Sequence, residues 1–320
     1  MLPAVSPVMS SSSTIPAELF GYKVVERIGE GAASVVYAVM DPKSRQVMAL
    51  KHVIRRSDKD QRFIDQVEQE YKVGSKLDHV NIRGIKRFMK NNKFMFGATL
   101  DAALLMELVD ASTLEGPFRP SGAQIGHYFA QTARALTHMH ERGFVHADMK
   151  PSNMMVCEDG TVKVIDLGQA CAVGTVKKRV QGTPGYIAPE QAQRREITPV
   201  TDVYNFGATL YWVLMRDEIP CILPSGSSRV SGTGDPSMLK LPKPLHEQDP
   251  RVPAEFSDLV MQCIQVDPGA RIQSMQLVAD RLDVIAANCR RTGAGRELEG
   301  RMGVGSAPDR AYDSEPTRGS

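Results

Sequence analysis

The sequence predicts an α+β protein with two lobes, in which a small β-rich lobe precedes a larger helical lobe. Residues 21–55 favour three strands, because β-branched and apolar residues recur there between turn signals. A helical stretch follows over about 60–77, and two further strand-like segments lie near 85–89 and 104–109. From residue 122 onward, apolar residues at helical spacing dominate. This single change from strand-like to helical patterns indicates the two lobes.

The second lobe contains one hairpin and two long loops. Asp159-Gly160 is a hairpin turn signal between the apolar runs NMMVC and VKVID. The apolar run from Tyr204 to Met215 is too short for the ~20 residues that span a bilayer, so we expect a buried core helix. The segments 168–185 and 221–250 are long for loops in a compact domain, and such loops tend to be functional.

Composition excludes several classes of protein. The 320 residues are 42% hydrophobic and 24% charged with a net charge of +2, which is ordinary for a globular protein. A polybasic nucleic-acid or membrane binder is therefore not expected. No Lys or Arg precedes Lys23, so the N-terminus lacks the charged region of a secretory signal. The 5 cysteines form no C-x-x-C pair, which favours reduced thiols in the cytoplasm.

Both ends of the chain differ from the part between them. Residues 1–18 are rich in Pro and Ser, and residues 290–320 are rich in Gly and in charges of both signs. Neither segment can bury enough apolar surface to offset the entropy of ordering, so we expect two disordered flanks. The interval 19–289 is then one domain, with the first lobe over about 19–108 and the second over about 109–289.

Two features of the first lobe suit a phosphate ligand. Gly29-Glu30-Gly31 lies between two strands, where glycines let backbone amides approach phosphates closely. Alone, this pattern could equally be a tight turn, and it is not a dinucleotide fingerprint because a strand follows it. Lys51 lies among apolar residues in the next strand and would point under the glycine turn.

The second lobe carries a cluster of polar residues on one loop. In the run from His146 to Asn153, Asp148 can supply a base, Lys150 a phosphate clamp and Asn153 a metal ligand. Asp166, followed by Leu167-Gly168, ends the hairpin, and a carboxylate there suits Mg²⁺, although a simple turn aspartate is the alternative. Further along, the segment GTPGYIAPE (182–190), Asp202 and Arg271 look like buried polar anchors, which are tolerated only when paired.

These motifs occur together in one order, and over about residues 21–288 the chain resembles the Hanks-type, eukaryotic-like serine/threonine protein kinases. The resemblance implies a bilobal protein kinase fold that uses ATP and Mg²⁺ to phosphorylate protein substrates. The Asp148-x-Lys150 pattern together with Gly182-Thr183 resembles the serine/threonine class, in which the Lys and the Thr both approach the catalytic Asp. The D-x-A-A-R-N pattern of the tyrosine class does not occur.

The resemblance assigns the residues around the nucleotide. Gly29 and Gly31 begin the phosphate-covering loop, and Lys51 holds the α- and β-phosphates and pairs with Glu70, with Glu68 as the rival. Met106 gates the pocket behind adenine, and Glu107 and Val109 present backbone groups to its edge. The apolar residues expected around the ring are Ile28, Val36, Ala49 and Met155.

The resemblance also assigns the residues that act on the phosphoryl group. Asp148 is the catalytic base that orients the substrate hydroxyl, and Lys150 steadies the transferring phosphoryl. Thr183 approaches Asp148. Asn153 and Asp166 hold magnesium.

Four positions depart from the family pattern. Ser34 replaces the third loop glycine and Leu167 replaces Phe of D-F-G, and both are mild changes. Gly74 stands where the family packs an aliphatic side chain, so we expect a gap and a loosely held helix, with Gly costing about 1 kcal/mol relative to Ala. The alternative is that a neighbouring side chain already fills the gap, in which case Gly74→Leu would clash. Ala147 replaces the Arg that ordinarily meets a phosphate on the activation loop.

The loss of that Arg predicts activity that is independent of activation-loop phosphorylation. Between Asp166 and Glu190 the Ser/Thr positions are Thr175 and Thr183 alone, and Thr183 is committed to catalysis. We expect the basic residues 177–179 to belong to the same loop without tying it to the core.

Three alternatives differ in class from a protein kinase. A pseudokinase scaffold would normally have lost Lys51, Asp148 or Asp166, and all three are present. A small-molecule kinase of the aminoglycoside or choline type would lack the 182–190 segment. A nucleotide-binding module without catalysis would be separated from an enzyme by ATP turnover. The sequence predicts neither the protein substrate nor the oligomeric state.

Overall fold

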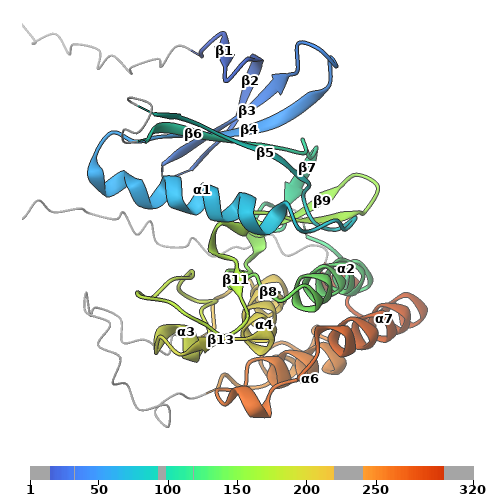
Figure 1. Cartoon of the computed structure of the whole chain (residues 1–320). Helices are drawn as coiled ribbons and strands as arrows, with labels where there is room; N and C mark the ends of the chain where they lie inside the picture. The colour runs from blue at the N-terminus through green and yellow to red at the C-terminus, as the bar shows by residue number, and fades with distance from the viewer. Residues whose placement is uncertain (1–14, 32, 93–98, 118, 220–240, 299–320) are drawn as a thin grey trace, which may run out of the picture.

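The fold was examined in a computed structural model that describes residues 15–31, 33–92, 99–117, 119–219 and 241–298. A curled antiparallel sheet with one long helix forms the first lobe, and a bundle of helices forms the second (Figure 1). The predicted bilobal α+β architecture is confirmed.

The first lobe is built on a six-stranded antiparallel sheet with the strand order β1-β2-β3-β4-β6-β5. Its strands are β1 (Glu18–Leu19), β2 (Tyr22–Gly31), β3 (Ser34–Met40), β4 (Val47–Ile54), β5 (Ile85–Asn92) and β6 (Thr99–Met106). The central strands are rich in Val, Ala and Leu because both of their faces are covered. Strand β4 pairs with β6, so Lys51 lies opposite Leu104 in the middle of the sheet.

One helix, α1 (Gln61–Gly74), packs against β4, β5 and β6. Its buried apolar residues recur at helical spacing. Ile64 and Val67 pack against β4 and β6, whereas Val73 packs into the core of the second lobe. The helix also contacts the 3₁₀ turn at Leu167–Gln169, which belongs to the second lobe. It therefore links the sheet to the segment that follows the hairpin.

The expected gap beside Gly74 is wrong, because a neighbouring side chain fills it. A Cβ atom placed on Gly74 would lie 2.4 Å from Cγ1 of Ile85 and 3.3 Å from Cδ1 of Leu167. Ile85, the first residue of β5, thus occupies the space that an aliphatic side chain on the helix would take. Gly74 permits close packing of α1 against β5, and it does not loosen the helix by leaving a void.

Gly74→Leu is accordingly expected to destabilise the protein, by roughly 1–3 kcal/mol for an overpacked core. Urea unfolding measures the loss, with Ile85→Ala as the single control and Gly74→Leu/Ile85→Ala as the partial rescue. If the Gly74→Leu protein were as stable as the wild type and more active, this would indicate that the space beside Gly74 is empty.

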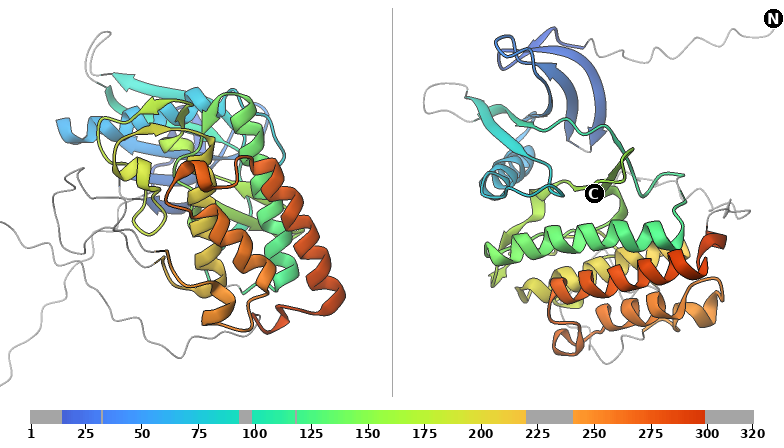
Figure 2. Two further views of the ribbon diagram at one scale, coloured as in Figure 1. Left: turned by 90° about the horizontal axis from the view of Figure 1, so that it is seen from below. Right: turned by 90° about the vertical axis from the view of Figure 1, so that its right-hand side faces the viewer.

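The second lobe is a bundle of helices around one large core. Its helices are α2 (Gly122–Glu141), α3 (Pro189–Ala192), α4 (Pro199–Met215), α5 (Leu245–Gln248), α6 (Ala254–Cys263) and α7 (Met275–Thr292). Helix α4 is buried on nearly all sides, as its continuous apolar run predicts. Helices α2 and α7 lie side by side (Figure 2). Their close approach requires Gly126, where a Cβ atom would come within 2.8 Å of Ala286.

Short strands lie between the helices and shape the loops of the site. They are β7 (Ala111–Thr113), β8 (Phe144–Val145), β9 (Met154–Cys157), β10 (Val162–Val164), β11 (Cys171–Ala172), β12 (Thr175–Val176) and β13 (Glu196–Ile197). The predicted hairpin is β9–β10, and Gly160 adopts the positive φ of 81° that its turn requires. Single 3₁₀ turns occur at Asp58–Asp60, Pro151–Asn153, Leu167–Gln169, Pro268–Ala270 and Arg296–Leu298.

The ordered domain extends beyond the boundaries expected from the sequence. Helix α7 continues to Thr292, and Leu298 packs into the core with 5% of its surface exposed. Apolar contacts of this tail with the helical lobe therefore order part of the segment predicted to be disordered. The rest of the predicted flanks, 1–14 and 299–320, and most of the 221–250 loop lie outside the described residues. None of the described helices is long and apolar enough to cross a membrane.

Candidate active site

A cavity of about 430 Å³ lies between the two lobes. It is lined by most of the residues predicted to surround a nucleotide, namely Ile28, Gly29, Gly31, Val36, Ala49, Lys51, Glu70, Met106, Val109, Asn153, Met155 and Asp166. Further lining residues that the sequence reasoning did not single out for this role are Glu30, Ser34, Arg83, Leu108, Thr113 and Ile165. Thr113 and Arg83 are not sequence neighbours of predicted residues, and Arg83 brings a charged side chain to the cavity.

Lys51 is the cationic centre of this cavity. Its Nζ lies 2.8 Å from Oε2 of Glu70 and 3.4 Å from Oδ1 of Asp166. Burial alone would lower the pKa of Lys51, but the two carboxylates outweigh it and raise the pKa above its ordinary value. Lys51 is thus a fixed positive charge at the floor of the pocket.

The structure distinguishes the two candidate partners of Lys51. Glu70 faces the cavity with only 3% of its side chain exposed. Glu68, on the same helix, forms an i,i+4 ion pair with Lys72 at the surface. Helical geometry separates residues two apart by more than half a turn, so only one of them can face Lys51.

Asp166 is placed by an unusual backbone conformation beside α1. Its φ of 60° lies in the left-handed region, which turns the chain sharply after strand β10. At Gly168 a Cβ atom would lie 2.7 Å from the side chain of Gln66 in α1, so a larger residue there would have to displace Gln66. Burial would raise the pKa of Asp166, but Lys51, His146 and Lys150 together outweigh burial and lower the pKa below its ordinary value, which keeps the carboxylate ionised.

Asp148, Lys150 and Thr183 form one hydrogen-bonded group. The Thr183 hydroxyl donates to Oδ1 of Asp148 at 2.9 Å, and Lys150 Nζ donates to the same hydroxyl at 3.0 Å. Lys150 Nζ also lies 3.3 Å from Oδ2 of Asp148. A hydroxyl group therefore already sits against the candidate base, beside a cation that can meet a phosphoryl group.

Asn153 and Asp166 can supply oxygen ligands for Mg²⁺. The Asn153 amide nitrogen donates to the Asp148 carbonyl at 2.8 Å, which leaves the amide oxygen for another partner. Both side chains line the cavity, and Asp166 is ionised. Magnesium is usually held by one or two protein oxygens together with substrate phosphates, so this donor set fits the ion.

The loop that carries Asp148 is held from below by Asp202. One carboxylate oxygen of Asp202 accepts the backbone N–H of His146 and contacts Nε2 of His140, and the other accepts the N–H of Ala147. Ala147 has a φ of 62°, a strained value for a residue other than glycine. The Gln191 side chain donates to the Ala147 carbonyl at 2.8 Å, which fixes the same peptide from the other side.

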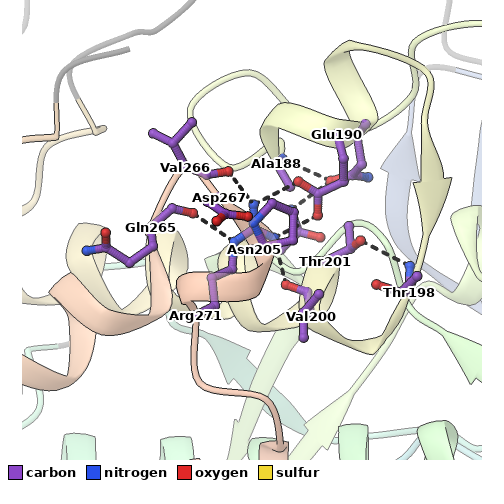
Figure 3. A network of polar contacts seen from close by, with 12 residues as sticks. Ala188, Glu190, Thr198, Val200, Thr201, Asn205, Gln265, Val266, Asp267 and Arg271 are labelled. Carbon is purple, nitrogen blue, oxygen red and sulfur yellow. Dashed lines mark hydrogen bonds and ion pairs between the residues drawn. The ribbon is translucent and has the colours of Figure 1, made fainter. Parts of the chain in front are cut away.

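A buried ion pair anchors the segment that ends at Glu190. Arg271 makes a bidentate contact with Glu190, with N–O distances of 2.7 and 2.8 Å (Figure 3). The guanidinium also donates to backbone carbonyls of residues 200, 265 and 266. A buried pair needs such additional bonds to offset its loss of hydration. The network joins α3, α4 and the start of the 3₁₀ turn at Pro268–Ala270.

The strand β6 leads into the backbone expected to meet the adenine edge. Met106 and Val109 line the cavity, whereas the side chain of Glu107 does not. The Glu107 N–H donates to the Gly84 carbonyl, and its carboxylate accepts the Gly84 N–H and pairs with Lys163. Of the Glu107 backbone groups, its carbonyl is thus the one left for a base.

The activation segment, residues 166–190, is tied to its surroundings without any phosphate. Strand β11 pairs with β8, and β12 pairs with β13. Lys177 Nζ donates to the Gln169 carbonyl at 2.7 Å. Both residues belong to the activation segment, so this contact braces the segment internally and does not tie it to the core.

Thr175→Ala is expected to keep most of the wild-type rate, because β12 and Lys177 hold the segment without a phosphate. The change removes one exposed hydrogen bond from Thr175 to the Ala172 carbonyl, worth about 0.5–1.5 kcal/mol of stability. Thr183→Ala, the matched threonine variant, should lose most activity. Steady-state rates of phosphoryl transfer, measured with phosphatase-treated protein, test the expectations for both variants. Recovery of a dead Thr175→Ala protein by Thr175→Glu would contradict this expectation.

The two-lobed fold, the buried Lys–Glu pair and the Asp–Lys–Thr group define the class of nucleotide-dependent phosphotransferases with a kinase architecture. The family described as "Protein kinase domain" matches residues 22–282. The chain belongs to the protein kinase family.

The curated relatives of this chain include bacterial and fungal proteins. It is 28% identical over 276 residues to a protein of Clostridium acetobutylicum named as a probable serine/threonine-protein kinase, covering 83% of this chain and 40% of that protein. It is 28% identical over 281 residues to the serine/threonine-protein kinase PknA of Mycobacterium tuberculosis, covering 84% of this chain and 62% of PknA. It is 27% identical to the cytokinesis protein sepH of Aspergillus niger, covering 85% of this chain and 20% of sepH. The chain thus spans less than two thirds of these relatives.

Proposed function

We propose that this protein transfers the γ-phosphoryl group of ATP to serine or threonine hydroxyls of protein substrates, with Mg²⁺ as the metal. The hydrogen-bonded group of Asp148, Lys150 and Thr183 carries the proposal, since it sets a base and a cation around one hydroxyl. Its place beside a cavity containing Lys51 and Asp166 supports a nucleotide as the phosphoryl donor.

The proposed mechanism depends mainly on positioning and charge. Lys51, held by Glu70, contacts the α- and β-phosphates. Asn153 and Asp166 would hold Mg²⁺, which would supply positive charge to offset that of the phosphates. Asp148 accepts the proton of the substrate hydroxyl as its oxygen bonds to the γ-phosphorus. The bond from that phosphorus to the β-phosphate oxygen breaks, and ADP leaves. Lys150 donates to the oxygens of the transferring group, where negative charge must be stabilised.

Phosphoryl transfer to peptides that contain a single hydroxyl tests the proposal. Purified protein, labelled ATP and Mg²⁺ are incubated with matched peptides that carry Ser, Thr or Tyr at one position. We expect label on the Ser and Thr peptides and none on the Tyr peptide. ATP binding without transfer to any peptide or protein would favour a pseudokinase or a binding module. Transfer to aminoglycosides or choline alone would indicate a small-molecule kinase.

We further propose a cytoplasmic location. The described cysteines, Cys157, Cys171, Cys263 and Cys289, are free thiols, which supports a reducing compartment. Cell fractionation followed by immunodetection checks this placement, and recovery in a secreted fraction would contradict it.

A further inference from the structure

The inner part of the nucleotide cavity contains a cation that the proposed mechanism does not use. Arg83 lines this cavity together with Lys51, Glu70 and Met106. Its backbone is fixed, because its N–H donates to the Val164 carbonyl at 3.0 Å, next to the bridge between Ile82 and Val164. The side chain is therefore held at the junction of the two lobes.

The guanidinium of Arg83 lacks a strong acceptor among the described residues. Nη1 contacts Sδ of Met106 at 3.2 Å, and a thioether sulfur is a weak acceptor. Nε is buried without a hydrogen-bond partner in the described part of the chain. A buried donor of this kind is costly unless a ligand completes it.

The nearby carboxylates are already engaged by other cations. Glu70 pairs with Lys51 at 2.8 Å, and Glu107 pairs with Lys163 at 2.7 Å. Burial lowers the pKa of Arg83, and these carboxylates oppose the effect, but an arginine remains charged at neutral pH. Arg83 thus places a charged guanidinium, with N–H donors that lack strong acceptors, at the inner wall of the cavity beside Met106.

The shape of a purine determines what this wall would meet. We expect the Watson–Crick edge of a purine to meet the backbone of residues 107–109, which would turn its N7 edge toward the inner wall. Adenine offers one acceptor there, N7, beside its 6-amino donor. Guanine and hypoxanthine offer two acceptors, O6 and N7, which match the parallel N–H groups of an arginine.

We propose that Arg83 is a base-recognition residue that lets this pocket accept 6-oxopurine nucleotides, GTP and ITP, as phosphoryl donors beside ATP. The proposal rests on the proposed function, because it assumes that the nucleotide occupies this cavity. The backbone carbonyl of Glu107 favours the 6-amino group of adenine. Arg83 offsets that preference, so the affinities and the kcat/KM values for ATP and GTP differ less than they would without it.

The test compares wild type with Arg83→Leu, which removes the donors and keeps an apolar side chain. Binding of ATP, GTP and ITP is measured by displacement of a fluorescent nucleotide, and transfer by kcat/KM. We expect the ATP:GTP and ATP:ITP ratios to rise roughly 10- to 100-fold in the variant, the discrimination typical of an arginine–guanine pair. Arg87→Leu is the matched control, because Arg87 is an exposed arginine four residues away in β5, and it should leave the ratios unchanged.

A second arm uses the unaltered protein and does not depend on the folding of a variant. Replacing GTP by 7-deaza-GTP removes the N7 acceptor and should weaken binding about tenfold. An unchanged ATP:GTP ratio in Arg83→Leu, with equal losses for both nucleotides, would overturn the inference while leaving the kinase function intact. Wild-type protein that binds none of the nucleotides would instead contradict the proposed function.

Discussion

Asp148→Asn is expected to lower kcat by about 10²–10⁴-fold and to leave the Kd for ATP nearly unchanged. The amide keeps the size of the side chain and one oxygen for the Thr183 hydroxyl, which donates to Asp148 at 2.9 Å. It removes the negative charge that accepts the proton and that faces Lys150. ATP affinity should persist because Asp148 is not among the residues that line the nucleotide cavity.

Single-turnover transfer and fluorescent nucleotide titration separate the two effects. Asp258→Asn makes the same chemical change on the exposed face of α6 and should behave as wild type. A melting temperature for each variant excludes unfolding as the cause of a loss. Transfer by Asp148→Asn at the wild-type rate would show that the base lies elsewhere, and a parallel loss of ATP binding would place Asp148 in nucleotide binding.

The sequence located these groups because each lies in a short segment with its own signature. Asp148, Lys150 and Asn153 share one loop, and Asp166 ends a hairpin with an Asp-Gly turn. Glu70 could be chosen over Glu68 because it stands nine residues before His79, in a segment that resembles a motif of the family. The long strands and helices were predictable for the same reason, since they repeat a pattern over many residues.

What the sequence did not predict depends on contacts between distant segments. The space beside Gly74 is filled by Ile85, a packing choice that no local pattern encodes. Arg83 lies at the pocket because the bridge between Ile82 and Val164 holds the neighbouring backbone there. Strands of two residues, such as β11 and β12, are too short to show periodicity.

The largest remaining effect is expected at the ion pair between Lys51 and Glu70. Lys51→Met should lower kcat/KM by about 10²–10³-fold, the usual cost of removing one preorganised group that stabilises charge. Glu70→Gln should cause a substantial part of the same loss, because it removes the carboxylate that holds Lys51 at 2.8 Å. The double variant should then fall short of the product of the two losses, with a coupling energy of about 0.5–3 kcal/mol.

Glu68→Gln supplies the matched control for this cycle. It makes the same change two residues away, at a carboxylate that pairs with Lys72 and not with Lys51. Lys51→Met and Glu68→Gln should therefore combine additively to within about 0.5 kcal/mol. Equal coupling energies in both cycles would show that the coupling arises from the helix as a whole and not from the ion pair between Lys51 and Glu70.

Urea unfolding measures the free energy of unfolding for each variant of the same cycle. Glu70 is only 3% exposed, so Lys51→Met leaves a buried carboxylate without its cation, which typically costs about 3–5 kcal/mol. Glu70→Gln in that background removes the buried charge and should restore part of the stability, while activity stays low because Lys51 no longer meets the phosphates. Recovery of stability without recovery of rate separates the structural role of the pair from its role in phosphoryl transfer. Recovery of both would show that Lys51 acts only by keeping the lobe folded.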